Sequence, residues 1–240
     1  DGVAEEGLCA ARNRASLEAV TLMPRVLRDT VSVDLGIEVF GERWSMPVGI
    51  APTGLNGLVR PRGDALLAAA AAAAGVPFTL STASNLALEQ VITSQAVPAP
   101  WFQLYVMHRD LAEQIVVRAR AAGYRALVLT VDVPVSGLRE RDVRNGFRLP
   151  MRMGPRLLWD IASHPRWACA MALHGAPRFA NLGPVDEKSV PAALQAALLA
   201  RSMDRSLAWE QLTWLRALWP GPLLLKGVLA PDDARRALDQ

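Results

Sequence analysis

Residues 101–141, WFQLYVMHRDLAEQIVVRARAAGYRALVLTVDVPVSGLRER, set the architecture of the chain. They predict a strand over 101–106, a helix with apolar residues at helical spacing that ends at Gly123, and a second strand in ALVLTVDV. The second run is apolar almost throughout, as is typical of a strand buried on both faces of a parallel sheet. Polar side chains stand near both strand ends: Gln103, Tyr105, Thr130 and Asp132. The unit therefore predicts a ligand site on an α/β fold.

The same alternation of strand and helix continues on both sides of this unit. Further strands are expected at 47–51, 76–80 and 223–228, and helices at 60–75, 86–92, 186–203, 207–219 and after Pro231. Much of the N-terminal half repeats at roughly 25 to 30 residues, the rhythm of a (β/α)8 TIM barrel. About five of the eight strands of such a barrel are expected here. An open doubly wound sheet is the alternative, although no G-x-G-x-x-G follows the first strand.

Composition narrows the class of protein. A chain of 240 residues with 51% hydrophobic residues has a large core, and we expect one domain over 1–240 with an insert at 150–185. The net charge of the chain is only +3, and the arginines are scattered along the sequence. This pattern argues against nucleic-acid binding and suits an anionic small ligand. The two cysteines are far apart, so neither a disulfide framework nor a metal site is predicted. They are compatible with a reducing compartment such as the cytoplasm.

Chemistry in a TIM barrel takes place at the C-terminal ends of the strands. Lys226, inside an apolar strand, needs an anionic partner, which is either a ligand or a buried structural carboxylate. Arg139 follows the strand of Asp132, and a guanidinium suits a carboxylate because it donates two parallel hydrogen bonds. The plainer alternatives are an ordinary loop arginine, a turn cap at Asp132, and a Tyr105 that only packs. These strand ends carry Thr53, Ser81, Gln103, Tyr105, Thr130, Asp132 and Lys226.

Five motifs, in order, resemble the FMN-dependent 2-hydroxy acid dehydrogenase and oxidase family. They are IAPTG (50–54), LSTAS (80–84), WFQLYV (101–106), LTVDVPVSGLRERD (129–142) and LLLKGV (223–228). PTGLNG and LSTASN look most like the mandelate dehydrogenase branch, and the segment after residue 155 looks like membrane-associated lactate and mandelate enzymes. The resemblance implies a TIM barrel, an FMN cofactor, and oxidation of an L-2-hydroxy acid to the 2-oxo acid.

The resemblance also implies roles for individual residues. The backbone of Pro52, Thr53 and Gly54 is expected along the flavin ring. Ser81, Gln103 and Thr130 are expected at its pyrimidine side, with Lys226 stabilising negative charge on the reduced ring. Tyr105 and Arg139 are expected to hold the substrate, and Asp132 to support the catalytic base.

One part of the family pattern does not occur in the printed sequence. The family's base is a histidine in S-N-H-G-G-R, after the lysine strand, and none of His108, His164 and His174 matches it. We therefore expect an internal fragment of a larger enzyme. The alternatives are a non-catalytic truncated barrel, or another FMN barrel such as a type 2 isopentenyl diphosphate isomerase, which L-T-x-D-x-P and R-E-R-D disfavour.

The resemblance extends to partners. Gly54, where oxidases commonly carry alanine, favours electron transfer to a quinone, and Ala83 suggests room for a large substrate side chain. Tryptophans and arginines in 150–184 predict peripheral contact with the inner face of the cell membrane, a lid over the site being the alternative. The longest apolar run, 65–76, is too short to span a bilayer. A homo-oligomer is also expected.

Overall fold

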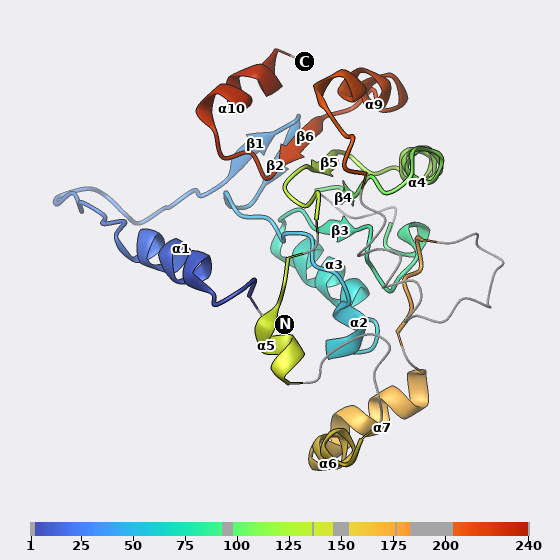
Figure 1. The fold of residues 1–240 in the computed structure, drawn as a ribbon. Helices are drawn as coiled ribbons and strands as arrows, with labels where there is room; N and C mark the ends of the chain where they lie inside the picture. Colours follow the sequence, from blue (N-terminus) through green and yellow to red (C-terminus); the bar gives the residue numbers. More distant parts are fainter. Residues whose placement is uncertain are drawn as a thin grey trace.

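The computed structural model describes residues 3–92, 98–135, 137–145, 154–175, 177–182 and 204–239. Its centre is a parallel four-stranded sheet in the order β3-β4-β5-β6, with a separate hairpin beside it (Figure 1). Ile50 adds a single parallel bridge to Phe78 beyond β3, so five parallel segments follow in chain order, as a partial barrel requires. The strands are β3 (Thr79–Ser81), β4 (Trp101–Leu104), β5 (Leu127–Thr130) and β6 (Leu223–Lys226).

The first predicted strand, 47–51, is reduced in the structure to a single bridge residue. Only Ile50 pairs with the sheet. Its N–H donates to the carbonyl of Pro77, and its carbonyl accepts from the N–H of Thr79. Pro47 and Pro52 flank this position and have no N–H to donate, which limits the ladder to one bridge.

The register of the sheet sorts its side chains onto two different faces. Ser81 pairs with Gln103, and Thr130 pairs with Lys226. Side chains alternate between the two faces of a strand. These polar residues therefore lie on one face of the sheet, and the leucines between them lie on the other. The opposite face is fully buried through Leu80, Phe102, Leu104, Leu127 and Leu129. The sheet therefore has a polar inner face and an apolar outer face.

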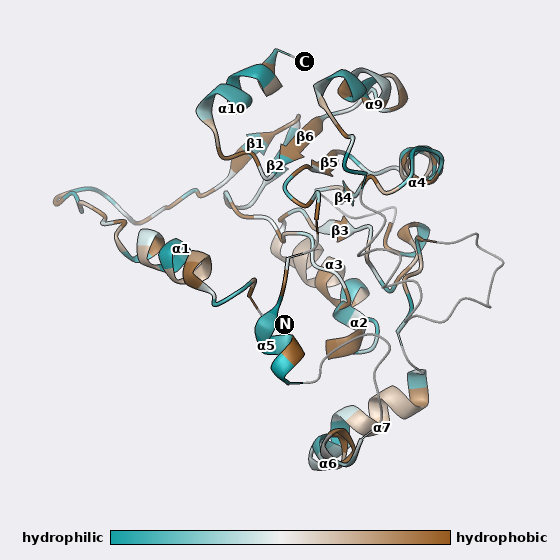
Figure 2. Ribbon diagram, in the orientation of Figure 1, coloured by the Kyte–Doolittle hydropathy of each residue, from teal (hydrophilic) through white to brown (hydrophobic). Residues whose placement is uncertain are grey.

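Three helices cover the outer face. Ala71 of α3 (Gly63–Ala74), Ile115 of α4 (Arg109–Ala122) and Leu215 of α9 (Leu212–Leu218) belong to one core cluster with the outer strand residues. Figure 2 shows brown along β6, whereas α4 and α10 (Pro231–Leu238) carry much teal. Helix α4 ends at Gly123 as predicted, in the left-handed conformation. The helix predicted at 86–92 is a single 3-10 turn, η1 (Leu88–Gln90), and a second, η2 (Trp209–Gln211), precedes α9.

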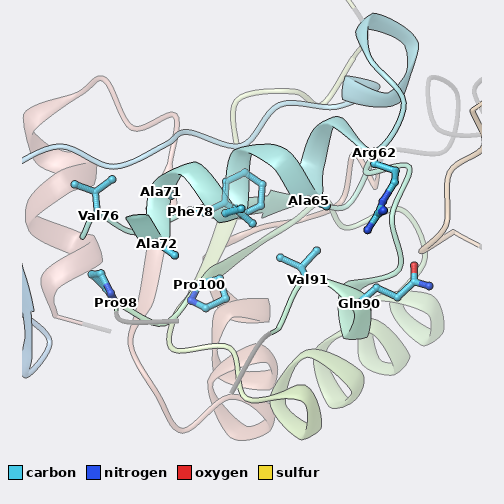
Figure 3. A pocket seen from close by; sticks show the side chains of 12 residues that line it. Arg62, Ala65, Ala71, Ala72, Val76, Phe78, Gln90, Val91, Pro98 and Pro100 are labelled. Atoms are coloured by element: carbon cyan, nitrogen blue, oxygen red, sulfur yellow. The ribbon is translucent and has the colours of Figure 1, made fainter. Parts of the chain in front are cut away.

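A cavity of about 250 Å³ lies on this helix side, between α3 and the segments around β3 and β4 (Figure 3). Alanines of α3 form one wall, and Phe78, Val91 and Pro100 face them. Alanine side chains are too short to fill the space that larger residues leave between a helix and a sheet. The cavity is therefore a packing feature of the outer face, away from the polar strand ends.

The N-terminal segments lie beside this sheet. Helix α1 (Leu8–Glu18) buries no residue, and β1 (Ile37–Val39) pairs antiparallel with β2 (Glu42–Trp44). The rings of Phe40 and Trp44 lie 5.7 and 5.4 Å from Trp101, the first residue of β4. The hairpin thus packs at the end of the sheet opposite the polar strand ends.

The predicted insert contains two helices, α6 (Pro155–Ser163) and α7 (Pro165–His174), which follow α5 (Glu140–Arg144) and lie apart from the sheet in Figure 1. Each begins with a proline, a residue whose fixed φ suits a first helical turn. The indole N–H of Trp167 donates to the carbonyl of Leu58, 2.8 Å away, in the short helix α2 (Asn56–Val59). The helix predicted at 186–203 lies outside the described residues.

Candidate active site at the strand ends

A chain of buried hydrogen bonds crosses three strand ends. The Ser81 hydroxyl donates to Oε1 of Gln103 over 3.0 Å, and Nε2 of Gln103 donates to Oγ1 of Thr130 over 2.9 Å. All three side chains are at most 5% exposed. The N–H of Ala83 in turn donates to Oγ of Ser81. The observed strand order and register thus bring these three residues together.

Lys226 and Asp132 meet at the next strand end. Nζ of Lys226 lies 3.6 Å from Oδ2 of Asp132, and both side chains remain partly exposed. A Cβ on Gly227 would lie 2.8 Å from the same carboxylate oxygen, so Asp132 packs against a position where only glycine fits. Lys226 therefore has a carboxylate partner, as expected if its partner is a structural carboxylate. The pair is not buried, however, because it lies at a solvent-accessible strand end.

Tyr105 lies within electrostatic reach of this pair. Burial, and next the negative charge of Asp132, raise the pKa of Tyr105, while the positive charge of Arg139 opposes the shift. Its backbone N–H donates to Oγ1 of Thr82, which itself donates to the carbonyl of Gln103. Arg139 directly precedes α5, with Nη1 4.0 Å from Asp142. Tyr105, Asp132 and Arg139 therefore share one electrostatic environment.

The loop containing Pro52, Thr53 and Gly54 lies against the loop that follows β3. The N–H of Leu55 donates to the carbonyl of Ala83, and a Cβ on Gly54 would lie 3.0 Å from that of Ala83. The Thr53 hydroxyl donates to Asn56, whose amide donates back to the Thr53 carbonyl. This close approach accounts for a glycine at position 54.

Sequence reasoning missed the polar residues beneath this loop. Asp64 was expected only in the first turn of a helix, yet it is 2% exposed and contacts Asn56, Ser84 and Asn85. A single acidic residue before a run of alanines resembles an ordinary helix start. The donors that surround it come from loops far away in sequence, which no local pattern reveals.

Comparisons with known proteins identify the family of the chain. The family model for FMN-dependent dehydrogenases matches residues 1–240. The chain belongs to the FMN-dependent dehydrogenase family. (S)-Mandelate dehydrogenase of Pseudomonas putida is 45% identical over 99% of this chain and 60% of that protein, and L-lactate dehydrogenase of Chromohalobacter salexigens is 41% identical over 99% and 61%.

Solved structures agree with the family assignment. The crystal structure of monotopic membrane protein (S)-mandelate dehydrogenase matches with a TM-score of 0.93 and 44% identity, over the whole of this chain and 63% of that chain. A mandelate oxidase with (S)-4-hydroxymandelic acid matches with a TM-score of 0.76 and 34% identity, over 99% and 61%. The fold of this FMN-dependent dehydrogenase family member is thus a partial TIM barrel. The chain spans about 60% of the length of the curated relatives it matches.

The donor groups at the strand ends fit the family's cofactor, FMN. After the hydrogen bonds above, Gln103 has a second amide N–H, Thr130 has its hydroxyl hydrogen, and Lys226 has ammonium hydrogens to donate. The pyrimidine edge of a flavin presents mainly carbonyl oxygens and a ring nitrogen, which accept hydrogen bonds. A donor-rich cluster therefore has the chemistry that this edge requires.

Among the helices that the structure describes, none has the length and apolar character needed to cross a bilayer. The described residues also contain no group of three or more histidine, cysteine or acidic side chains arranged to hold a metal ion.

Proposed function

We propose that this protein oxidises an L-2-hydroxy acid of the mandelate or lactate type to the 2-oxo acid. FMN supplies the chemistry by accepting two electrons from the substrate. The observation that carries the proposal is the Lys226–Asp132 pair beside the Ser81–Gln103–Thr130 chain. That arrangement combines hydrogen-bond donors with a cation where negative charge develops on the cofactor, next to a carboxylate that can support a base.

We assign cofactor contacts to two groups of residues. Ser81, Gln103 and Thr130 hold the pyrimidine edge, with Ser81 fixing the Gln103 amide through its hydrogen bond. Lys226 stabilises negative charge at the same edge, and its position at a strand end leaves it accessible to the ring. The backbone of Pro52, Thr53 and Gly54 lies along the ring, and the absence of a side chain at Gly54 permits close approach.

Substrate binding falls to Tyr105 and Arg139 in this proposal. Arg139 binds the substrate carboxylate, which a guanidinium pairs with through two hydrogen bonds. The hydroxyl of Tyr105 donates a hydrogen bond to the substrate, and burial, which raises its pKa, favours this protonated form further. The carboxylate of Asp132 orients the base that removes the substrate proton.

That base is not one of the histidines in these 240 residues. His164 lies near Asp160, and His174 contacts the carbonyl of Ala170. His108 is the residue that directly precedes α4. All three lie at helix ends, and our proposal assigns the base to none of them.

The substrate class rests on the relatives and on Ala83. The two proteins named above are called (S)-mandelate dehydrogenase and L-lactate dehydrogenase, which differ in the size of the substrate side chain. The small side chain of Ala83 favours an aromatic substrate. Gly54 favours a quinone over oxygen as electron acceptor, and turnover with oxygen that matched the rate with quinone would contradict this part of the proposal.

We also propose peripheral membrane contact through α6 and α7. Leu158, Trp159 and Leu173 on these two helices are 53%, 77% and 83% exposed, and exposed tryptophan and leucine on a helix suit contact with a membrane surface. One structural relative is described as a monotopic membrane protein. The inner face of the cell membrane and a homo-oligomeric state are part of the same proposal, on sequence grounds alone.

The test is a visible absorption spectrum of the purified full-length protein, before and after addition of (S)-mandelate or L-lactate without oxygen. We expect a flavin spectrum that bleaches. A flavin spectrum that stays unchanged with every 2-hydroxy acid tried would favour the alternative, a flavin-binding barrel without catalysis. A colourless protein that does not take up added FMN would contradict the proposal outright.

A further inference from the structure

A buried carboxylate connects the two loops at the proposed flavin site. Asp64 is 2% exposed, and both of its oxygens accept hydrogen bonds. Nδ2 of Asn56 donates to Oδ1 over 2.7 Å. The Ser84 hydroxyl and the Asn85 N–H donate to Oδ2 over 2.7 and 3.2 Å. Within the described ranges, these partners are all neutral donors.

The position of Asp64 would suggest a simpler role. It lies in the first turn of α3, where a carboxylate favours the helix dipole. However, the N-terminus of α3 has no side-chain cap, and the hydrogen bonds of Asp64 go to residues outside the helix. A residue that served only the helix would not need to be buried, because an exposed aspartate has the same effect on the dipole.

The partners of Asp64 belong to the two loops that approach the ring in our proposal. Asn56 is bonded twice to Thr53, through the Thr53 hydroxyl and the Thr53 carbonyl. Ser84 and Asn85 follow Ser81 at the end of β3. Asn85 also accepts the N–H of Gly57 through Oδ1, over 2.9 Å. One carboxylate therefore joins the Thr53 loop to the end of β3, in addition to the direct hydrogen bonds from Leu55 to Ala83 and from Gly57 to Asn85.

A carboxylate suits this position for a chemical reason. Three donors converge on it, and an ionised carboxylate accepts at both oxygens, whereas an amide accepts at one only. An asparagine here would direct its own N–H groups toward a donor: Asn56 on one side, or the Asn85 N–H on the other. An opposed pair of donors in a buried site is costly, and the loops would separate to relieve it.

We propose that Asp64 is a positioning residue for the flavin site. Its carboxylate ties the Pro52–Thr53–Gly54 loop to the Ser81 end of β3, and so fixes the backbone that would face the ring. The inference rests on the proposed function, since it assumes that FMN occupies these strand ends. Asp64 itself does not contact the ring in this proposal.

The test compares Asp64→Asn with Asn181→Asp in the full-length flavoprotein. Asn181 is also fully buried, and it holds the carbonyl of Leu86 and the N–H of Leu88 rather than the Thr53 loop. Each substitution exchanges a side-chain oxygen and an NH2 group. Asp64→Asn places an N–H against a donor, and Asn181→Asp places an oxygen against the carbonyl of Leu86, in both cases in a buried site. We expect comparable losses of thermal stability. Only Asp64→Asn should weaken FMN binding, by about tenfold for one lost hydrogen bond to a charged group, and shift the flavin midpoint potential.

Ser84→Ala provides a second variant in case Asp64→Asn does not fold. It removes one donor from the carboxylate, and we expect a smaller change in the same direction. Unchanged FMN affinity and potential in Ser84→Ala and in any folded Asp64→Asn, with stability alone reduced, would overturn the inference but leave the proposed function intact. A wild-type protein that binds no FMN would overturn both.

Discussion

Lys226 and Asp132 form an ion pair across two neighbouring strand ends, with Nζ 3.6 Å from Oδ2. Thr130 pairs with Lys226 in the ladder, so the lysine is also next to the last residue of the Ser81–Gln103–Thr130 chain. The cation thus stands between a carboxylate and a hydrogen-bond donor. In the proposed function, this position places one side chain next to both the cofactor and the carboxylate that orients the base.

Replacement of Lys226 by methionine should slow flavin reduction. Lys226→Met nearly keeps the length of the side chain but removes the charge that we propose stabilises the reduced cofactor, and we expect the rate to fall by about 100-fold. The measurement is the anaerobic rate of flavin bleaching with saturating 2-hydroxy acid. Arg235→Met, at a mostly exposed cation of α10, is the control and should keep the wild-type rate. A Lys226→Met rate within twofold of wild type would remove Lys226 from the mechanism.

Replacement of Gln103 by leucine should destabilise the fold and weaken FMN binding together. Gln103→Leu leaves the Ser81 and Thr130 hydroxyls without their partner in a buried place, at a cost of about 1 to 3 kcal/mol. Gln114→Leu, at an exposed position of α4, is the matched control. Chemical denaturation and FMN titration measure the two effects. Equal stability of both variants would show that the hydrogen-bond chain contributes nothing.

Gly227 and Gly123 allow backbone strain to be separated from steric overlap. Both have positive φ, +105° and +93°, so alanine should cost about 1 kcal/mol at each. Only at Gly227 would the new Cβ overlap Asp132, whereas nothing lies within 4 Å at Gly123. We therefore expect Gly227→Ala alone to slow substrate-driven flavin reduction. Similar slowing in Gly123→Ala would mean that strain, not displacement of Asp132, is responsible.

Acid should weaken the contact between η1 and α4. Arg118 donates to both oxygens of Glu89, over 2.8 and 3.0 Å, and chiefly this hydrogen bonding lowers the pKa of Glu89. Because the folded pKa lies below the unfolded one, the stabilisation is present above the unfolded value and disappears as pH falls through the folded value. Glu89→Gln should cost about 0.5 kcal/mol at neutral pH, since Glu89 is half exposed.

The measurement is urea denaturation of wild type and Glu89→Gln from pH 7 to pH 3. The difference should shrink below the unfolded pKa of about 4.3, because a protonated glutamate resembles glutamine. Glu6→Gln, at an exposed position, serves as the reference for a simple change in net charge. A difference that stays constant down to pH 3 would be inconsistent with the ion pair.

Trp159 should contribute to membrane binding. Trp159→Ser removes the most exposed aromatic side chain of α6, and we expect about tenfold weaker binding to vesicles that contain anionic lipid. Leu238→Ser, an exposed apolar position on α10, is the control and should leave vesicle binding unchanged. Co-sedimentation measures both. Equal binding by the two variants and wild type would argue against a membrane role for α6.

The strands and the residues at their ends could be predicted from sequence because period and polarity are local signals. ALVLTVDV contains β5, and LLLKGV contains β6 with Lys226 at its last position. The hydrogen bonds around Asp64 could not be predicted, since the donors come from two loops that are distant from each other in sequence. The helices α6 and α7 were also missed, because Trp, Pro and Arg obscure the helical period there.

The ladder between β5 and β6 has a consequence for the order of folding. Ser81 and Gln103 are 22 residues apart, and Gln103 and Thr130 are 27 apart, so the first two pairings close short loops. The β5–β6 pairing instead encloses everything from Val131 to Pro222. Loop-closure entropy rises with length, and distant contacts form slowly. The hydrogen-bond chain should therefore assemble early, and Lys226, the residue that brings positive charge to the site, should join it last.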